Sequence, residues 1–211
     1  MTSDHLIFII KAAQATIILS IISLIGGFIL AIFVAFLSLI KVKILNLIAK
    51  TYIQIFRGTP LLMQVFFIFF SLPQLGIQLS IMSSALVALI TNTGAFMSEI
   101  IRSSIQSVPK SQWDAANSLG MKKKHVLIKV IIPQAIKIAI PPTVGYITAL
   151  IKNTSVASTI GLLEITRAGR LVTEQTGLGL LSFAFVGLIY FLICFPISRI
   201  SANLEKKAHL I

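Results

Sequence analysis

The sequence is poor in charge, and poorest in acidic charge. Only 11% of its 211 residues are charged, and Asp and Glu number six against eighteen Lys and Arg. A soluble domain carries about 25% charged residues, whereas 56% of this chain is hydrophobic and its mean hydropathy is +0.98. No polar segment is long enough to build a core of its own. These deficits exclude a soluble domain and predict a protein that crosses a membrane several times.

Cysteine and histidine are too few or too scattered for a disulfide or a metal site, and a phosphate-binding motif is absent from the sequence. The single Cys194 lies in an apolar run, which excludes an intrachain disulfide. His5, His125 and His209 are too far apart for metal-ligand spacing, so we expect no metal site. None of the twelve glycines is followed by Lys, which excludes a GxxxxGK[ST] loop. We also find no nucleophile–base arrangement, and therefore expect no enzyme activity, ATP hydrolysis included, from this chain.

What the chain does contain is apolar segments long enough to be membrane helices. We predict an all-α membrane protein, a single domain over residues 1–211, with five transmembrane helices at about residues 12–40, 60–72, 80–101, 130–150 and 180–200. The first segment is longer than the roughly 7–15 apolar residues of a signal peptide, so we expect it to be a membrane helix.

Proline marks the expected irregularities of these helices. Pro60 suits the first turn of the second span, with Thr59 as its cap and Tyr52–Phe56 as an interfacial turn before it. Pro141 and Pro142, together with Pro133, predict that the fourth span is a discontinuous helix.

The distribution of basic residues predicts which side each loop faces. With the N-terminus outside and the C-terminus in the cytosol, Lys11, Lys152, Arg167 and Arg170 stay outside. The other fourteen basic residues then lie in cytosolic segments: Lys41, Lys43, Lys50, Arg57, Arg102, Lys110, Lys122, Lys123, Lys124, Lys129, Lys137, Arg199, Lys206 and Lys207. This positive-inside bias accounts for the net charge of +12 and argues against a nucleic-acid partner. We expect basic residues at the membrane surface to contact lipid.

The longest polar interruption, the predicted cytosolic loop 103–129, has an internal order. An Ala-rich helical run with Asp114 near its start leads to Gly120, then to a basic turn, and then to an amphipathic run ended by Pro133. An acidic side chain suits the start of a helix, and glycine permits a turn that other residues resist. We interpret this loop as a docking element.

These motifs resemble those of a known family, the membrane subunits of bacterial ABC importers. Asp114-Ala-Ala, three residues, Gly120, nine residues and Val130-Ile-Ile-Pro133 resemble the EAA loop, with Asp for the usual Glu. Five further runs are similar to the polar amino-acid subfamily: Phe56–Gln64, Ser98–Arg102 continuing to Gln106–Trp113, Ile132–Ala135, Ile151–Ser155 and Leu163–Ala168. The resemblance covers almost the whole chain.

The resemblance implies a type I ABC importer-like permease in the bacterial inner membrane that takes up a polar amino acid. ATP and Mg²⁺ would bind to a separate ATPase subunit. A second permease, identical or homologous, and an extracytoplasmic amino-acid-binding protein would complete the complex. The residues expected to couple to the ATPase are Asp114, Ala115, Ala116, Ser118, Leu119, Gly120 and Pro133. The rival class is a secondary transporter or channel that works without ATP, which would leave the ordered cytosolic loop unexplained.

Polar residues within the predicted spans are the candidates for a solute path. They are Gln64, Asn92, Thr93, Glu99, Asn153, Thr154 and Ser155. Each also has a structural interpretation. Gln64 could serve packing, Asn92 and Thr93 could bond neighbouring helices, and Glu99 could pair with Arg102 three residues later or form a gate. The run from Asn153 could bind a zwitterion at a helix break or cap the next helix.

Overall fold

The chain is helical along nearly its whole described length. The computed structural model describes residues 2–40 and 42–208, and those two ranges contain no β-strand. Lys41 and His209, both named above, lie outside the described residues, as does the side chain of Lys207. In chain order the helices are α1 (Ser3–Leu39), α2 (Lys43–Gly58), α3 (Leu61–Phe66), α4 (Ile81–Gln106), α5 (Lys110–Ser118), α6 (Lys123–His125), α7 (Ile132–Asn153), α8 (Ile165–Thr176) and α9 (Gly179–Ala208).

Tighter or wider helical turns join some of these helices. Two are π turns, η1 (Phe67–Ser71) and η3 (Val126–Ile131). Two are 3₁₀ turns, η2 (Leu72–Leu75) and η4 (Thr154–Ile160).

Within residues 2–40 and 42–208, four helical runs are long and apolar enough to cross a membrane. They are α1, α4, the run Lys123–Ile160 that contains α7, and α9. The pair formed by α2 and the run Leu61–Leu75 passes the same test jointly, although it is bent by 105° between its two parts. The prediction of an all-α protein with several spanning helices is confirmed, with four spans or five if the bent pair is one. The orientation of the termini remains a prediction.

Helix α4 is the helix on which α1, α2 and α7 pack. Its most extensive contact is with α1, and it also contacts α2 and α7. Small residues allow the close approach to α1: a Cβ added at Gly27 would lie 2.4 Å from Cγ2 of Thr93. Membrane helices depend on such close packing because lipid supplies little hydrophobic driving force between them. The main apolar core surrounds this seam and includes Leu19, Leu89, Met97 and Leu150.

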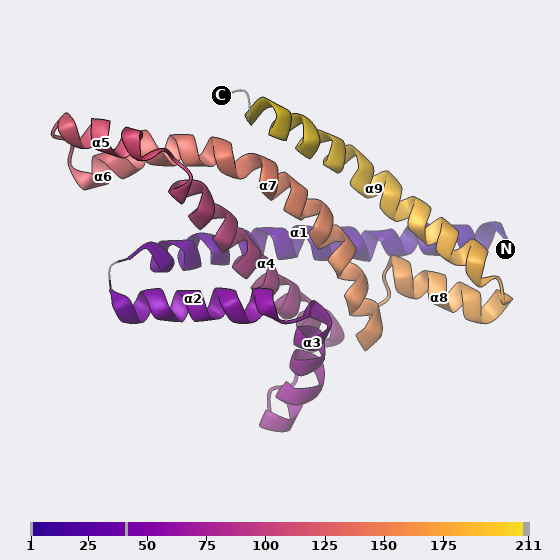
Figure 1. Ribbon diagram of the computed structural model, residues 1–211. Coiled ribbons are helices and arrows are strands. Elements are labelled where there is room, and N and C mark those ends of the chain that lie inside the picture. The colour runs from indigo at the N-terminus through magenta and orange to yellow at the C-terminus, as the bar shows by residue number, and fades with distance from the viewer. Residues whose placement is uncertain (1, 41, 209–211) are drawn as a thin grey trace.

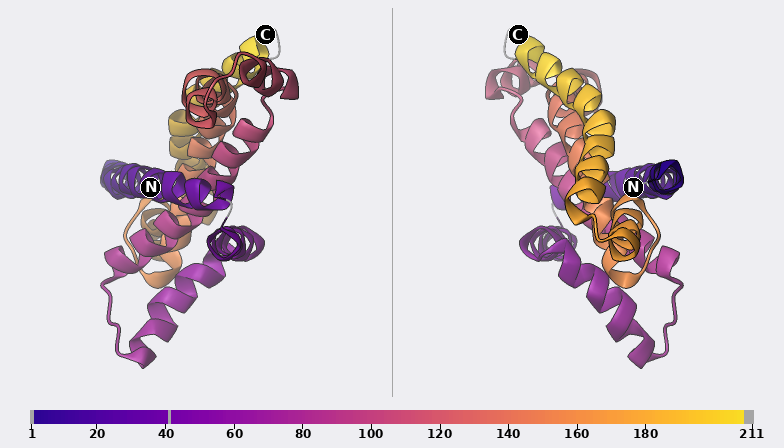
Figure 2. Two further views of the ribbon diagram at one scale, coloured as in Figure 1. Left: turned by 90° about the vertical axis from the view of Figure 1, so that its left-hand side faces the viewer. Right: turned by 90° about the vertical axis from the view of Figure 1, so that its right-hand side faces the viewer.

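Of the remaining helices, α9 runs beside α7, and the short helices lie toward the ends of the molecule (Figure 1). α9 packs along α7 and α8, and a second core joins α1, α8 and α9. The short helices α5 and α6 lie at the end where α9 finishes, whereas the tip of the run that begins with α3 lies at the opposite end in both views of Figure 2.

The predicted discontinuity of the fourth span is wrong. α7 continues unbroken through Pro141 and Pro142, and Pro133 lies in its first turn. Internal prolines are tolerated in membrane helices that pack against other helices. α7 packs against α9, and the buried hydroxyl of Ser201 on α9 donates to the carbonyl oxygen of Pro141 at 3.1 Å. The irregular turns lie before and after this helix, at η3 and η4.

The start of the second span also differs from the prediction. Instead of an interfacial turn at Tyr52–Phe56, the chain forms the 16-residue helix α2. Thr59 is the C-cap of α2, and Pro60 precedes the first turn of α3 as its N-cap. The cause is amphipathicity, since Ala49 and Ile53 are buried against α1 while the charged residues of α2 stay exposed.

Candidate functional site

The first candidate site is the docking end formed by α5, α6 and η3. Pro109 precedes α5 and fixes its start, so Asp114 lies in the second turn of the helix rather than near its beginning as expected. The Ala-rich sequence suits a short helix because Ala has the highest helix propensity. α5 is held by a small apolar core of its own, built from Val108, Ala116 and Val126 with the partly buried Trp113 against them.

Gly120 ends α5 in the manner that its sequence position predicts. Its φ is +67°, in the left-handed region that glycine adopts without strain. Its N–H donates to the carbonyl oxygen of Asn117 at 2.9 Å, and the N–H of Met121 donates to that of Ala116 at 3.3 Å. This pair of bonds is the Schellman cap of a helix C-terminus. The turn predicted at Gly120 is therefore confirmed.

The predicted coupling residues lie together around α5, but they do not share one environment. Asp114, Ala115, Ser118 and Leu119 are exposed, whereas Ala116 is buried in the core beneath the helix. Leu119 leaves 81% of its surface exposed, although it lies among polar neighbours. Leu119 is the C-cap residue of α5, so its exposed apolar side chain lies at the end of this helix.

The docking end is joined firmly to the membrane part of the molecule. η3 packs against α5 and continues directly into α7. Gln134, in the first turn of α7, donates to the Gln112 side chain on α5 at 3.3 Å and to the carbonyl oxygen of Val130 at 2.9 Å. Pro133 lies at this junction and not at the end of a helix. A displacement of α5 would therefore reach α7.

The second candidate site is a polar seam where α2, α3 and α4 meet. Gln64 and Asn92 are both buried, and Asn92 Nδ2 donates to Gln64 Oε1 at 3.2 Å. Both amides also donate to the carbonyl oxygen of Phe56, Gln64 at 2.8 Å and Asn92 at 3.2 Å. Gln64 additionally donates to the carbonyl and hydroxyl oxygens of Thr59. These bonds satisfy carbonyl groups that the break between α2 and α3 leaves free.

Thr93 lies on the other side of α4 and contacts α7 instead. It is fully buried, and the Tyr146 hydroxyl donates to its Oγ1 at 3.2 Å. Tyr146 also stacks on Phe96, with ring centroids 5.5 Å apart. Sequence reasoning missed Tyr146, because an isolated tyrosine in an apolar helix is usually a packing residue.

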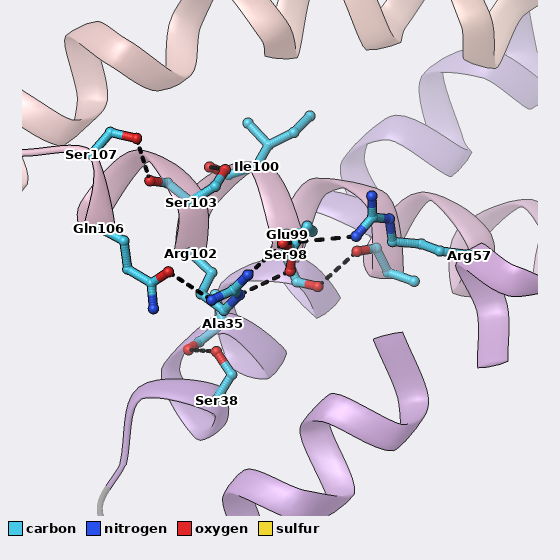
Figure 3. A network of polar contacts seen from close by, with 11 residues as sticks. Ala35, Ser38, Arg57, Ser98, Glu99, Ile100, Arg102, Ser103, Gln106 and Ser107 are labelled. Atoms are coloured by element: carbon cyan, nitrogen blue, oxygen red, sulfur yellow. Dashed lines mark hydrogen bonds and ion pairs between the residues drawn. The ribbon is translucent and has the colours of Figure 1, made fainter. Parts of the chain in front are cut away.

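Glu99 is the centre of a charged cluster near the end of α4 (Figure 3). Arg102 donates to both of its carboxylate oxygens, at 2.9 and 2.5 Å, which confirms the predicted pairing three residues apart. Arg57 approaches from the end of α2 and its Nη1 lies 3.8 Å from Oε1. The guanidinium of Arg57 also lies 5.5 Å from the centroid of the Phe96 ring.

The run Asn153–Ser155 lies where α7 passes into η4, at the other end of the polar region. Thr154 is fully buried and donates to the carbonyl oxygen of Ile151, and the more exposed Ser155 donates to that of Lys152. Neither side chain caps α8. That helix is capped by Glu164, which accepts from the N–H groups of Thr166 and Arg167 at 3.0 and 2.8 Å.

Glu164 is a second polar residue that sequence reasoning missed. It is fully buried and also accepts from the Tyr190 hydroxyl at 2.9 Å. Burial raises the pKa of this carboxyl above its usual value of 4.5, and the three hydrogen bonds oppose that effect only in part. The position of Glu164 just before a helical run could have predicted that it caps this helix. Its contact with Tyr190 could not be predicted, because Tyr190 lies on the distant helix α9.

The structure thus brings some predicted path residues together and separates others. Gln64 joins Asn92, whereas Thr93 joins Tyr146 and Glu99 joins two arginines. η4, which begins at Thr154, packs against both α3 and α4. It therefore adjoins the helix that carries Gln64 and the helix that carries Asn92, Thr93 and Glu99. Within residues 2–40 and 42–208 no three His, Cys, Asp or Glu side chains gather as a metal site would require.

Comparison with known proteins finds relatives along nearly the entire chain. The family model described as "Binding-protein-dependent transport system inner membrane component" matches residues 27–209. The L-cystine transport system permease protein TcyB of Bacillus subtilis (strain 168) is 40% identical over 193 residues, covering 91% of this chain and 82% of that protein. The probable glutamine ABC transporter permease protein GlnM of the same organism is 35% identical over 192 residues, covering 91% and 89%.

Solved structures agree with these sequence relatives. A chain from the crystal structure of an amino acid ABC transporter with histidines has a TM-score of 0.91 and 30% identity, covering 98% of this chain and all of that one. A chain from an inward-facing MetNI methionine ABC transporter has a TM-score of 0.75 at 16% identity, covering 97% and 99%, which is evidence for the fold alone.

Proposed function

Because the chain belongs to the family of binding-protein-dependent transport system inner membrane components, we propose that it is the permease subunit of an ATP-driven importer for a polar amino acid. The observation that carries this proposal is similarity over almost the full length to permeases named for cystine and glutamine transport. As a member of this family the chain is a multi-pass component of the bacterial inner membrane.

In this proposal α5 is the coupling helix that docks on a separate ATPase subunit. ATP and Mg²⁺ bind to that subunit, and this chain hydrolyses nothing. The docking face consists of Asp114, Ala115, Ser118 and Leu119, while Ala116 and Gly120 keep the helix in place. Support comes from the exposure of Leu119 and from the bonded junction between α5 and α7.

The complete importer contains two permeases on two ATPases, with the second permease identical or homologous to this chain. The N-terminus lies outside, where a binding protein delivers the amino acid, and α5 lies in the cytosol. ATP binding closes the ATPase pair and draws the coupling helices together, and rigid-body rocking of the spans then opens the path to the other side. The positive-inside distribution of the basic residues supports this orientation.

The solute path runs beside α4 and includes Gln64, Asn92, Thr93 and Glu99, with the run Asn153–Ser155 at its outer part. Support comes from the polarity of these residues and from the irregular backbone next to them. Asn153 ends α7 and is the N-cap residue of the 3₁₀ turn η4, and Gln64 follows the break between α2 and α3. In membrane proteins, irregular backbone is tolerated where it is buried in protein or lines a water-filled cavity.

A matched pair of glycine substitutions tests the coupling assignment. Gly120→Leu places a side chain on the docking helix at φ +67°, and Gly177→Leu does the same at φ +67° at the end of α8. A Cβ would meet no atom within 4 Å at either site, so the backbone strain of about 1–2 kcal/mol is matched. We expect Gly120→Leu to abolish solute-stimulated ATPase activity and uptake by the reconstituted complex, and Gly177→Leu to retain most of both.

Equal activity of the two variants would refute the coupling assignment. The rival interpretation, an ATP-independent transporter or channel, predicts uptake by the permease alone in liposomes driven by an ion gradient. We expect no such uptake without the ATPase subunit.

A further inference from the structure

The charged cluster at the end of α2 has a part that the proposed path does not use. We propose that the guanidinium of Arg57 is a binding site for the carboxylate of the transported amino acid, on the cytosolic side of the path. This inference rests on the proposed function and deepens it, since it names the group of the solute that is bound and the residue that binds it.

The first step concerns charge. Arg57, Glu99 and Arg102 form a cluster of two guanidinium groups and one carboxylate, which leaves a net charge of +1. Arg102 is the main partner of this carboxylate, because it donates to both oxygens of Glu99. It also donates to Gln106 Oε1 at 2.7 Å. Arg57 therefore shares this carboxylate only through the longer 3.8 Å contact, and one positive charge of the cluster is not neutralised.

The second step concerns hydrogen bonding. The 3.8 Å between Arg57 and Glu99 is longer than the 2.7–2.9 Å of a charge-assisted hydrogen bond. Among the hydrogen bonds of the described residues, none comes from the Arg57 guanidinium, whose side chain is 41% exposed. A guanidinium carries five N–H donors in a planar fork that matches a carboxylate. Those donors are available to a ligand.

The third step concerns position. Phe56, the residue before Arg57, has its carbonyl oxygen fixed by the amides of Gln64 and Asn92. The Phe96 ring supports the guanidinium from one side. Because Asn92, Phe96 and Glu99 follow one another at spacings of four and three residues, they lie on one face of α4. Arg57 is therefore held beside the polar face of the proposed path, as Figure 3 shows for its approach to Glu99.

These three properties select a carboxylate over other groups. An ammonium group would be repelled by the net positive charge, and a neutral amide could not neutralise it. A carboxylate can accept two parallel hydrogen bonds from the guanidinium and also neutralise the cluster. Every zwitterionic amino acid carries such a group, whereas its α-amide does not.

The test compares an amino acid with its own α-amide on the intact permease–ATPase complex. The amino acid is the one that the wild-type complex takes up best from a panel, and binding is measured without the binding protein, which would impose its own selectivity. We expect Arg57→Gln to reduce the preference for the acid over the amide about tenfold or more, because a charged hydrogen-bonded pair is lost. Arg57→Lys, which keeps the charge but lacks the fork, should reduce it by a smaller factor.

Lys50→Gln is the matched control. Lys50 lies seven residues before Arg57 on the same exposed face of α2, about 10 Å away along the helix, and the variant removes the same charge. We expect it to keep the wild-type preference. If Arg57→Gln does not assemble, Arg57→Lys decides the outcome alone.

An unchanged acid-to-amide preference in the Arg57 variants would overturn the inference, and it would do so even if their stability were reduced, because that combination indicates a purely structural arginine. Failure of the proposed function looks different: the wild-type complex itself would bind and transport no amino acid from the panel.

Discussion

The seam between α1 and α4 allows a quantitative prediction from one methyl group. We consider Gly27→Ala, on the helix that makes the most extensive contact with α4. The added Cβ would lie 2.4 Å from Cγ2 of Thr93 and 2.5 Å from its Cβ. Since the Cβ position follows from the backbone, no side-chain rotation of Thr93 can relieve the contact. The two helices must separate by about 1–1.5 Å to restore the usual carbon–carbon distance of about 3.5–4.0 Å.

The expected cost follows from three contributions. Overpacking of this kind destabilises by about 1–3 kcal/mol. Separation of the helices also strains the hydrogen bond between Tyr146 and Thr93, which is worth about 1 kcal/mol. The replacement of a helical glycine by alanine returns about 1 kcal/mol. We therefore expect a net loss of about 1–3 kcal/mol, and a fall in Tm of several degrees at roughly 2–4 °C per kcal/mol.

The assay is thermal unfolding of the purified protein in detergent, with Gly187→Ala in α9 as the control. A Cβ at Gly187 would meet no atom within 4 Å, so this variant should keep or slightly raise the Tm. If Gly27→Ala were as stable as Gly187→Ala, the close contact between α1 and α4 would not exist as described.

Two further predictions concern the docking helix and the buried acid. Leu119→Ser should leave the Tm unchanged, because Leu119 is 81% exposed, but should weaken binding of the ATPase subunit in a pull-down; unchanged binding would exclude Leu119 from the interface. Glu164→Gln should cost about 1 kcal/mol, because the amide has only one oxygen for the two N–H groups that the N-cap satisfies. Burial raises the pKa of Glu164, so the folded protein binds this proton more tightly than the unfolded chain does. The wild type should therefore lose stability as the pH rises from 4.5 through the raised pKa of Glu164. Measured across this pH range, the Tm of Glu164→Gln should fall less than that of the wild type. Parallel curves of Tm against pH would contradict this prediction.

Local properties of the sequence predicted what depends on near neighbours in the chain. Hydropathy predicted the long helices, the glycine after an Ala-rich run predicted the left-handed turn at Gly120, and a spacing of three residues predicted the pair of Glu99 and Arg102. Each of these features involves residues no more than one helical turn apart or a single long apolar run.

Features that depend on distant partners could not be predicted in this way. The bond from Ser201 on α9 to the carbonyl oxygen of Pro141 on α7 joins residues 60 positions apart. Likewise, the link between Asn92 and the carbonyl oxygen of Phe56 spans 36 positions. The amphipathic helix α2 was missed because its buried face is narrow, with only Ala49 and Ile53 fully buried.

The π turn η3 sets the rotation of α6, the short helix after the docking helix, relative to α7. A π turn contains one residue more than an α-helical turn between bonded groups, which offsets what precedes it by about 100° of rotation about the helix axis. Because α5 packs against η3, the surface on which α5 rests contains this one additional residue between Val126 and Ile131. We expect deletion of Ile128 to keep every residue of α5 but to change the orientation of α5 relative to α7.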